Sequence, residues 1–229
     1  MCGRFTLTAG PEEVRAALGL DAIEDFPPRE NIAPTEPIAI VRNENGIRRL
    51  ALVRWGFVPS WVKDPGAFTL LFNARSETAA EKASFRSALR YRRCLVPASG
   101  FYEWQRGPGK GKQPYLVRPR EGGVVAYAGI YELWAGADGS EIETACILTT
   151  AANDTLAAIH DRMPVVIHPE DFERWLDVRN SPNAIADLLR PAPEDFFELV
   201  PVDVRINSTR KKSPEANPKR PKPDQPSLF

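Results

Sequence analysis

The stretch PIAIVRNENGIRRLALVRW, residues 37–55, decides the class of fold. It contains two apolar, β-rich runs, 37–42 and 47–55, separated by the turn sequence NENG. An Asn-Gly pair readily adopts the positive φ angles of a tight hairpin turn. The stretch therefore predicts two antiparallel strands joined by a hairpin.

Runs of the same kind continue along the rest of the chain. The run at 94–105 is β-rich and is broken at Pro97 and Gly100. Further strands are expected at 114–118, 124–134, 142–150 and 196–204, and short helices at 11–19, 78–92, 153–159, 169–177 and 183–190. Hairpin-linked strands with short helices between them predict an α+β fold with a largely antiparallel sheet.

The composition is that of an ordinary globular protein, with 43% hydrophobic and 26% charged residues. Lys+Arg and Asp+Glu both number 30, so the chain is no bulk polycation, although a local basic groove is compatible with this balance. Three scattered cysteines favour a reducing compartment over a disulfide framework. No apolar run approaches the ~20 residues that span a bilayer, and the N-terminal segment lacks the apolar core of a signal peptide. We expect a cytoplasmic protein.

The composition changes after residue 207. Residues 208–229 hold six Lys or Arg, two acidic residues and five prolines, a mixture that cannot bury enough apolar surface to fold alone. We therefore expect one folded domain, 1–207, and a disordered, basic, Pro-rich tail, 208–229. The tail is either a solvated segment or a tether that touches DNA phosphate or a partner.

The second residue offers unusual chemistry. If Met1 is removed, Cys2 carries a free α-amine and a thiol on adjacent carbons. The amine can condense with an aldehyde to an imine, and the thiol can add to the imine carbon to close a five-membered thiazolidine ring. A free α-amine has a reference pKa of about 7.7–8.0, so much of it is available as a nucleophile near neutral pH. The alternative interpretation is a small buried hydrophobe at the start of a strand.

Three other polar residues lie in segments braced by Gly, Pro or aromatic residues, as functional loops often are. Asn73 begins NARSET, Glu103 lies between Tyr102 and Trp104, and His160 begins HDRMPV. Taken singly, each has an ordinary structural interpretation: a turn asparagine, an exposed strand carboxylate and a helix-capping histidine.

The set of motifs as a whole resembles the SOS response-associated peptidase (SRAP) family, also known as abasic-site processing proteins. The similar segments occur in the order of the family and cover roughly residues 1–205. They are MCGRF at 1–5, NIAP at 31–34, WGFVPSW at 55–61, NARSET at 73–78, RRCLVPASGFYEW at 92–104, LTTAAN at 148–153 and HDRMPV at 160–165.

The resemblance implies one α+β domain around a barrel-like antiparallel sheet. It also implies a protein of DNA repair and the SOS response that senses abasic sites in single-stranded DNA and forms a thiazolidine crosslink through Cys2. Asn73 would position the N-terminal residue, Glu103 would transfer protons, and His160 would assist proton transfer and reversal of the crosslink. Weak AP-lyase activity is implied too. Loss of Met1 could come from self-processing or from an aminopeptidase.

A path for the DNA strand follows from the same motifs. The resemblance implies that Arg4, Arg75 and Arg162 contact phosphates and that Pro34, Trp61 and Trp104 pack against bases. The tryptophans Trp55, Trp61 and Trp104 could instead belong to the core. Val62 departs from the family, because several members have a second aromatic residue after Trp61.

Two other classes of function remain open. Cys2 and His160 could form the nucleophile and base of a cysteine hydrolase that acts on peptides. Alternatively, the chain could be a non-catalytic single-stranded DNA-binding module with a structural Cys2. A zinc site is poorly supported, because three Cys and two His show no CxxC or HxxxH spacing, and we expect no metal or other cofactor.

The segment Gln225–Phe229 resembles the Gln-x-x-Leu-Phe pentapeptides by which bacterial replication and repair proteins bind the sliding clamp. A glutamine and a Leu-Phe pair offer one polar and two apolar anchors for a preformed pocket. The alternative interpretation is a soluble tail that happens to end in Leu-Phe. The partner expected is thus single-stranded DNA with abasic sites, with the sliding clamp as a further candidate and no membrane. We expect a monomer that joins the nucleoid when it is bound to DNA.

Overall fold

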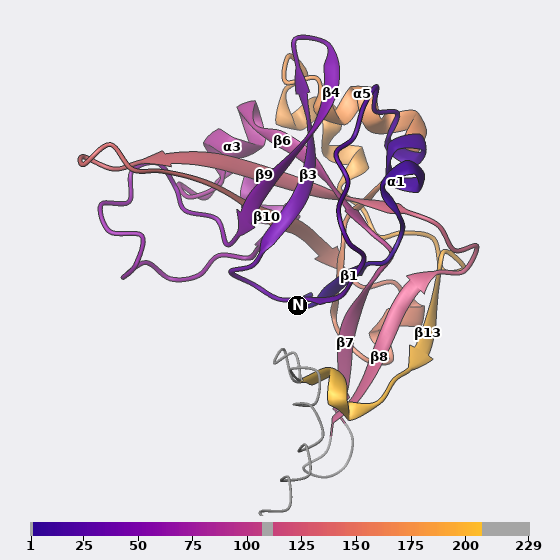
Figure 1. The fold of residues 1–229 in the computed structure, drawn as a ribbon. Helices are drawn as coiled ribbons and strands as arrows, with labels where there is room; N and C mark the ends of the chain where they lie inside the picture. Colours follow the sequence, from indigo (N-terminus) through magenta and orange to yellow (C-terminus); the bar gives the residue numbers. More distant parts are fainter. Residues whose placement is uncertain (1, 107–111, 208–229) are drawn as a thin grey trace, which may run out of the picture.

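A computed structural model describes residues 2–106 and 112–207 (Figure 1). The strands are β1 (Phe5–Leu7), β2 (Arg29–Ile32), β3 (Pro37–Glu44), β4 (Ile47–Trp55), β5 (Asn73–Arg75), β6 (Arg93–Ala98), β7 (Gly100–Arg106), β8 (Lys112–Pro119), β9 (Val125–Ala135), β10 (Glu141–Ala151), β11 (Arg162–Pro164), β12 (Val166–Ile167) and β13 (Phe197–Pro201). The α-helices are α1 (Pro11–Leu18), α2 (Ser76–Ala79), α3 (Arg86–Tyr91), α4 (Asp154–Ala157) and α5 (Phe172–Leu176), with 3-10 turns at Pro169–Asp171, Pro182–Leu188 and Val204–Asn207.

The strands form two sheets. An eight-stranded sheet has the order β11-β10-β4-β3-β6-β9-β12, and β9 also pairs with β10, which closes β10-β4-β3-β6-β9 into a five-stranded barrel. β5 joins the barrel by pairing with β10. The second sheet has the order β13-β8-β7-β1-β2 and lies below the barrel in Figure 1. Pairing is antiparallel except where β10 meets β4 and β5, so the expected α+β, largely antiparallel, barrel-like fold is confirmed.

Several local expectations agree with the structure. β3 and β4 pair from Pro37↔Arg54 to Glu44↔Ile47, and the turn between them has φ of 54° at Asn45 and 89° at Gly46, as Asn-Gly favours. The helix expected at 11–19 is α1, which ends at Gly19 in the left-handed conformation.

One expected helix is wrong in extent. The spacing at 78–92 predicted a single helix, but the chain forms α2 and α3 with a turn between them. Phe85 precedes α3 and packs its ring against Phe57, with 5.6 Å between centroids. We attribute the break to this tertiary contact, which outweighs the weak helical propensity of the segment. The segment expected as a helix at 183–190 is a 3-10 turn over Pro182–Leu188.

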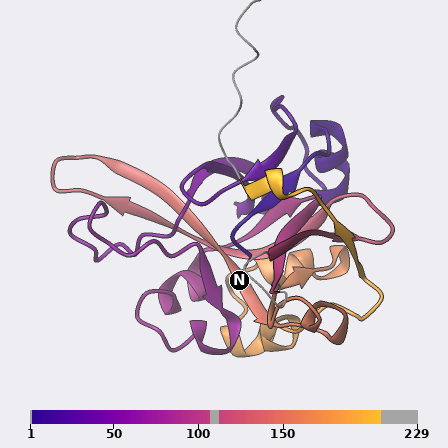
Figure 2. The same cartoon turned by 90° about the horizontal axis from the view of Figure 1, so that it is seen from below.

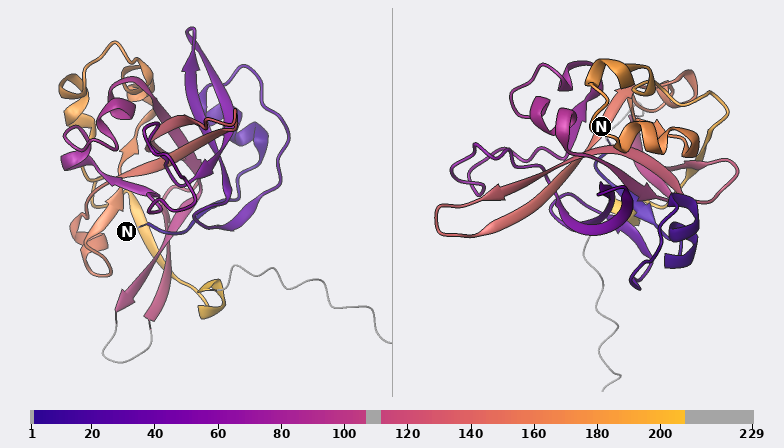
Figure 3. Two further views of the ribbon diagram at one scale, coloured as in Figure 1. Left: turned by 90° about the vertical axis from the view of Figure 1, so that its left-hand side faces the viewer. Right: turned by 90° about the horizontal axis from the view of Figure 1, so that it is seen from above.

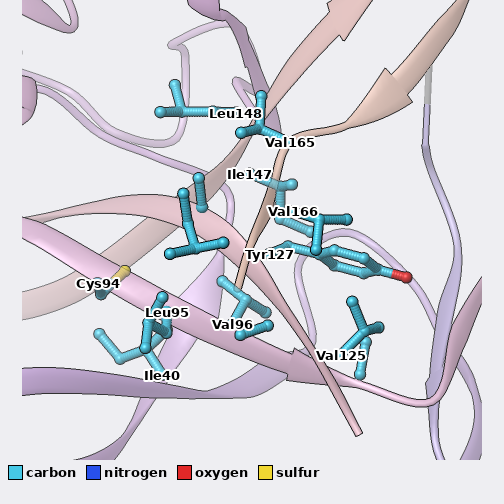
Figure 4. Close-up of a cluster of buried hydrophobic side chains, with 14 of the residues drawn as sticks. Ile40, Cys94, Leu95, Val96, Val125, Tyr127, Ile147, Leu148, Val165 and Val166 are labelled. Atoms are coloured by element: carbon cyan, nitrogen blue, oxygen red, sulfur yellow. The ribbon is translucent and has the colours of Figure 1, made fainter. Parts of the chain in front are cut away.

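The core fills the barrel. β6 is buried along its whole length, and so is most of β9. Figure 4 shows how Leu95 and Val96 of β6 lie among side chains from β9, β10 and the β11–β12 region. Such continuous apolar strands are buried on both faces, and each fully buried aliphatic side chain stabilises the fold by about 1.5–3 kcal/mol.

Two hairpins project from this body. β9 and β10 extend past the barrel as a long two-stranded arm, seen at the left of Figure 1 and from below in Figure 2. β7 and β8 project on another side, as Figure 3 shows. Among the described residues, no helix is long and apolar enough to cross a membrane. The expected tail, 208–229, and its pentapeptide lie outside the described residues.

Candidate functional site

The N-terminal segment is anchored between two strands. Phe5 of β1 pairs with Phe101 of β7 on one side and with Ile32 of β2 on the other. The backbone N–H of Tyr102 donates to the carbonyl of Arg4 at 2.9 Å, so the chain just before β1 is also held against β7. Cys2 precedes this anchor, and its side chain is fully buried.

Asn73 reaches Cys2 from the barrel. β5 pairs in parallel with β10, with Asn73 opposite Ile147, and this short strand carries the asparagine next to the N-terminal segment. The Asn73 side-chain Nδ2 donates to the Cys2 carbonyl at 2.8 Å, while the Cys2 thiol donates to the Arg4 carbonyl at 3.6 Å. The asparagine therefore holds the backbone of the residue whose chemistry the sequence singled out.

Glu103 and His160 form the second half of the site. Glu103 follows Phe101 and Tyr102 along β7 and is only 3% exposed. His160 follows α4, and its Nε2 lies 4.0 Å from Glu103 Oε2. The His160 Nδ1 accepts the backbone N–H of Arg162 at 3.0 Å. The same Nδ1 also lies 3.1 Å from Asp161 Oδ1, so Nε2 is the ring nitrogen that faces Glu103.

The electrostatics keep the Cys2 thiol protonated. Burial, and after it the negative charge of Glu103, raises the pKa of Cys2 well above its usual range. Burial, and then a charge on Cys2, also raises the pKa of Tyr127 well above its usual value. The Tyr127 hydroxyl is buried, accepts and donates no hydrogen bond among the described residues, and points away from the apolar side chains labelled in Figure 4.

Arg162 is held by an internal pair. Its Nη1 and Nη2 donate to the two carboxylate oxygens of Glu77 at 2.7 and 2.8 Å, and Nη2 also donates to the Thr149 carbonyl at 2.5 Å. The hydrogen bonds to Arg162 lower the pKa of Glu77. Sequence reasoning singled out neither Glu77 nor Thr149, although both lie inside quoted motifs, because the pairing joins residues 85 positions apart.

The other expected DNA-contacting residues lie in different settings. Arg4 donates to Asn31 Oδ1 at 2.9 Å, and Arg75 is exposed at the end of β5. Trp61 is 59% exposed on the segment between β4 and β5. Trp104 lines a pocket of about 370 Å³ together with His160. Pro34 is partly buried in the turn before β3.

Val62 does not replace an exposed aromatic residue. It is 7% exposed and packs with Val58 and Trp134, whose Nε1 donates to the Val62 carbonyl at 2.6 Å. This position therefore packs against the outer half of the β9–β10 arm, where Trp134 pairs with Ile142.

The remaining thiols lie in the barrel core. Cys94 and Cys146 are fully buried, and none of the three cysteines forms a disulfide. Burial raises the pKa of both core thiols. Within residues 2–106 and 112–207, no group of three or more His, Cys, Asp or Glu side chains is arranged to hold a metal ion.

The fold and the site define a class of protein: an α+β barrel in which the Asn73 amide holds the carbonyl of residue 2, the Glu103 charge acts on its thiol, and His160 lies against Glu103. The sequence model of the family "SOS response associated peptidase (SRAP)" matches residues 1–209. The chain belongs to this family.

Two relatives and one solved structure are similar over most of the chain. "Abasic site processing protein YoqW" of Bacillus subtilis is 37% identical over 219 residues, which cover 94% of this chain and 98% of that protein. "Abasic site processing protein YoaM" of the same organism is 36% identical, with 94% and 96% covered. A crystal structure of a Bacteroides thetaiotaomicron protein has a TM-score of 0.78 at 27% identity, covering 89% of this chain and 93% of that one.

Proposed function

We propose that this chain processes abasic sites in single-stranded DNA and captures them covalently through Cys2 once Met1 has been removed. One observation carries the proposal: Asn73 holds the Cys2 carbonyl at 2.8 Å in a buried site that also contains Glu103 and His160. The names of the relatives, abasic site processing proteins, support the choice of substrate. The protein acts as a monomer in the cytoplasm, on the nucleoid when it is bound to DNA.

The reaction has two bond-forming steps. The Cys2 α-amine attacks the aldehyde carbon of the ring-opened sugar, and loss of water leaves an imine. The Cys2 sulfur then adds to the imine carbon. The thiol proton leaves sulfur, the imine nitrogen gains a proton, and a five-membered thiazolidine results.

The residues around Cys2 suit these proton transfers. Glu103 is buried beside the thiol and can accept the proton that leaves sulfur. His160 Nε2 lies 4.0 Å from Glu103 Oε2, so the imidazole can pass a proton to the sugar oxygen or to nitrogen, and it can assist the reverse reaction. Asn73 fixes the carbonyl of Cys2 and thereby limits where the amine and the thiol can lie.

The raised pKa of Cys2 bears on the hydrolase alternative. A cysteine hydrolase needs a thiolate, usually paired with a histidine, as its resting nucleophile. Here the thiol donates to the Arg4 carbonyl, and its pKa is raised rather than lowered. Imine formation uses the amine first, so a neutral thiol is no obstacle. We therefore restrict any peptidase role to self-processing of Met1, and any AP-lyase role to weak β-elimination from the imine.

The test is to incubate methionine-free protein with single-stranded DNA that contains one abasic site. We expect a denaturation-resistant adduct, and we expect it to form faster than on continuous duplex, because phosphates and exposed base faces guide binding. Intact mass spectrometry should show that Met1 is absent from the reactive protein.

The matched control keeps the N-terminus blocked. Protein that retains Met1, or carries an N-terminal tag, should bind the strand but form no stable adduct, because it lacks the free amine on Cys2. Equal crosslinking by blocked and processed protein would rule out the thiazolidine.

A second proposal concerns partners. Residues 208–229 would tether the domain to a bacterial sliding clamp through Gln225–Phe229. The segment must be ordered on binding, so we expect a Kd on the order of micromolar for a labelled 208–229 peptide. A Leu228→Ala/Phe229→Ala peptide should lose this binding. Equal binding by both peptides would contradict the proposal and leave the crosslinking chemistry untouched.

A further inference from the structure

A small pocket lies at the start of the segment between β4 and β5 that carries Trp61. It has a volume of about 210 Å³, and Thr35, Arg54, Gly56, Phe68 and Leu70 are among the residues that line it. The pocket lies where β4 ends, at Trp55, and is separate from the pocket beside His160.

The charged group of this pocket is the Arg54 guanidinium, which has no partner in the part of the chain that the structure describes. The Arg54 side chain is partly buried, and among the described residues no carbonyl or carboxylate accepts a hydrogen bond from its guanidinium or forms an ion pair with it. Other partly buried arginines are paired: Arg42 with Glu143, and Arg48 with Glu173. A guanidinium that is removed from water needs hydrogen-bond acceptors. The oxygens of a phosphate or carboxylate match the geometry of its N–H groups.

The backbone around the pocket is held in unusual conformations. Ala33 to Glu36 form a tight turn in which the Glu36 N–H donates to the Ala33 carbonyl at 3.2 Å. Its third residue, Thr35, has φ of 79°, a value that glycine adopts easily and a β-branched residue adopts at a cost. Such strain gathers at functional sites, and here it places a hydroxyl-bearing residue on the pocket wall.

A glycine keeps the pocket open. A Cβ on Gly56 would lie 2.6 Å from Leu70 Cδ1 and 3.6 Å from Arg54 Nη1. Gly56 also has φ of 147°. A side chain here would therefore collide with the pocket wall and crowd the guanidinium.

The position of the pocket points to a DNA strand. Phe68 lines it and packs edge-on against the exposed Trp61 ring, with 5.7 Å between centroids. Pro34 precedes Thr35 in the turn. The segment between β4 and β5 ends at Phe72, which immediately precedes Asn73. The Phe72 carbonyl accepts the Trp55 Nε1–H at 2.8 Å. The pocket thus lies between a base-stacking surface and the chain that enters the site.

We propose that Arg54 and Thr35 bind one backbone phosphate of the single strand, next to the nucleotide whose base stacks on Trp61. The inference rests on the proposed function, since it assigns a phosphate subsite to the same DNA strand. Arg54 supplies the charge, and the Thr35 hydroxyl supplies a further donor.

The experiment measures equilibrium binding of fluorescently labelled, undamaged single-stranded DNA over a series of salt concentrations. Undamaged DNA has no aldehyde, so the signal reports binding alone. We expect Arg54→Gln to raise Kd about tenfold at low salt, as the loss of one charged hydrogen-bonding pair does. We also expect the slope of log K against log salt to become shallower by about 0.7. Arg54→Lys should keep most of the slope.

The matched control is Arg49→Gln, on the same strand β4 but near the hairpin turn, where the side chain is 59% exposed. It should leave both Kd and slope within error of the parent. Arg49→Gln should also crosslink abasic DNA as the parent does.

The outcomes separate the two proposals. If the parent protein neither binds nor crosslinks the strand, the proposed function fails. If the parent binds and crosslinks the strand, and Arg54→Gln shows the same Kd and the same salt dependence, the proposed phosphate subsite is wrong. A third outcome is that inorganic phosphate stabilises the parent but not Arg54→Gln, while both proteins bind DNA with the same Kd. This result would assign the pocket to a free anion and overturn the strand assignment.

Thr35→Gly provides an independent check, because it has opposite effects on stability and binding. Relief of the strained φ should raise Tm by about 2–4 °C, while loss of the hydroxyl should weaken DNA binding. A rise in both stability and affinity would contradict a role for the Thr35 side chain in the subsite.

Discussion

Cys2→Ala should abolish the stable adduct with abasic DNA, whereas Cys94→Ala and Cys146→Ala should leave it intact. Only Cys2 can place a thiol next to a free α-amine. Cys94 and Cys146 are internal residues whose α-nitrogens are in peptide bonds, so neither has a free amine beside its thiol, and both are fully buried in the barrel. The expected loss is complete within the sensitivity of a denaturing gel.

The same variant separates the two steps of the reaction. Cys2→Ala keeps an α-amine after methionine removal, so it should still form a transient imine. Borohydride should then trap a reduced adduct that is absent without the reductant. Adduct formation lost in Cys94→Ala or Cys146→Ala but retained in Cys2→Ala would place the chemistry at another residue.

The long, periodic elements of this fold could be predicted from the sequence. The hairpin of β3 and β4 follows from two apolar runs around Asn-Gly, and α1 follows from Pro11 at its start and Gly19 at its end. Only the family resemblance implied the closure of the barrel, because closure depends on the parallel pairing of β10 with β4, across about 90 residues. No local pattern encodes such a contact.

The site was harder to predict, for a physical reason. β1, β5 and β11 support Cys2, Asn73 and the chain after His160, yet each is only three residues long. A run that short has no measurable period and is stabilised by its neighbours. The family resemblance supplied Cys2, Asn73, Glu103 and His160, and the structure brings them together.

Arg93 lies in the motif at 92–104, but nothing in the motif indicated its role. It is 1% exposed, and its five N–H groups donate to backbone carbonyls alone. Nε donates to Trp175 at 2.6 Å, Nη1 to Leu89 at 2.9 Å and Arg90 at 3.5 Å, and Nη2 to Asp177 at 2.6 Å and Asn180 at 3.2 Å. These carbonyls lie at the ends of α3 and α5, where helices leave acceptors unsatisfied.

Arg93→Met should therefore lower the free energy of unfolding by about 3–5 kcal/mol, because the substitution leaves several buried carbonyls without donors. In a domain of this size that corresponds to a fall in Tm of roughly 10 °C. Burial lowers the pKa of Arg93 to about 10, so the guanidinium is charged at neutral pH and its hydrogen bonds are charge-assisted. Chemical denaturation and thermal melts measure both quantities.

Two further variants identify the cause of this loss. Arg93→Lys keeps the charge but offers three donors instead of five, so it should restore only part of the lost stability. Arg179→Met removes a surface arginine that is 89% exposed and pairs with Asp177 in the same segment, and it should cost less than about 1 kcal/mol. If Arg93→Met were no more destabilising than Arg179→Met, water would have to hydrogen-bond the freed carbonyls in the variant. The guanidinium would then not be the group that holds α3 and α5 together.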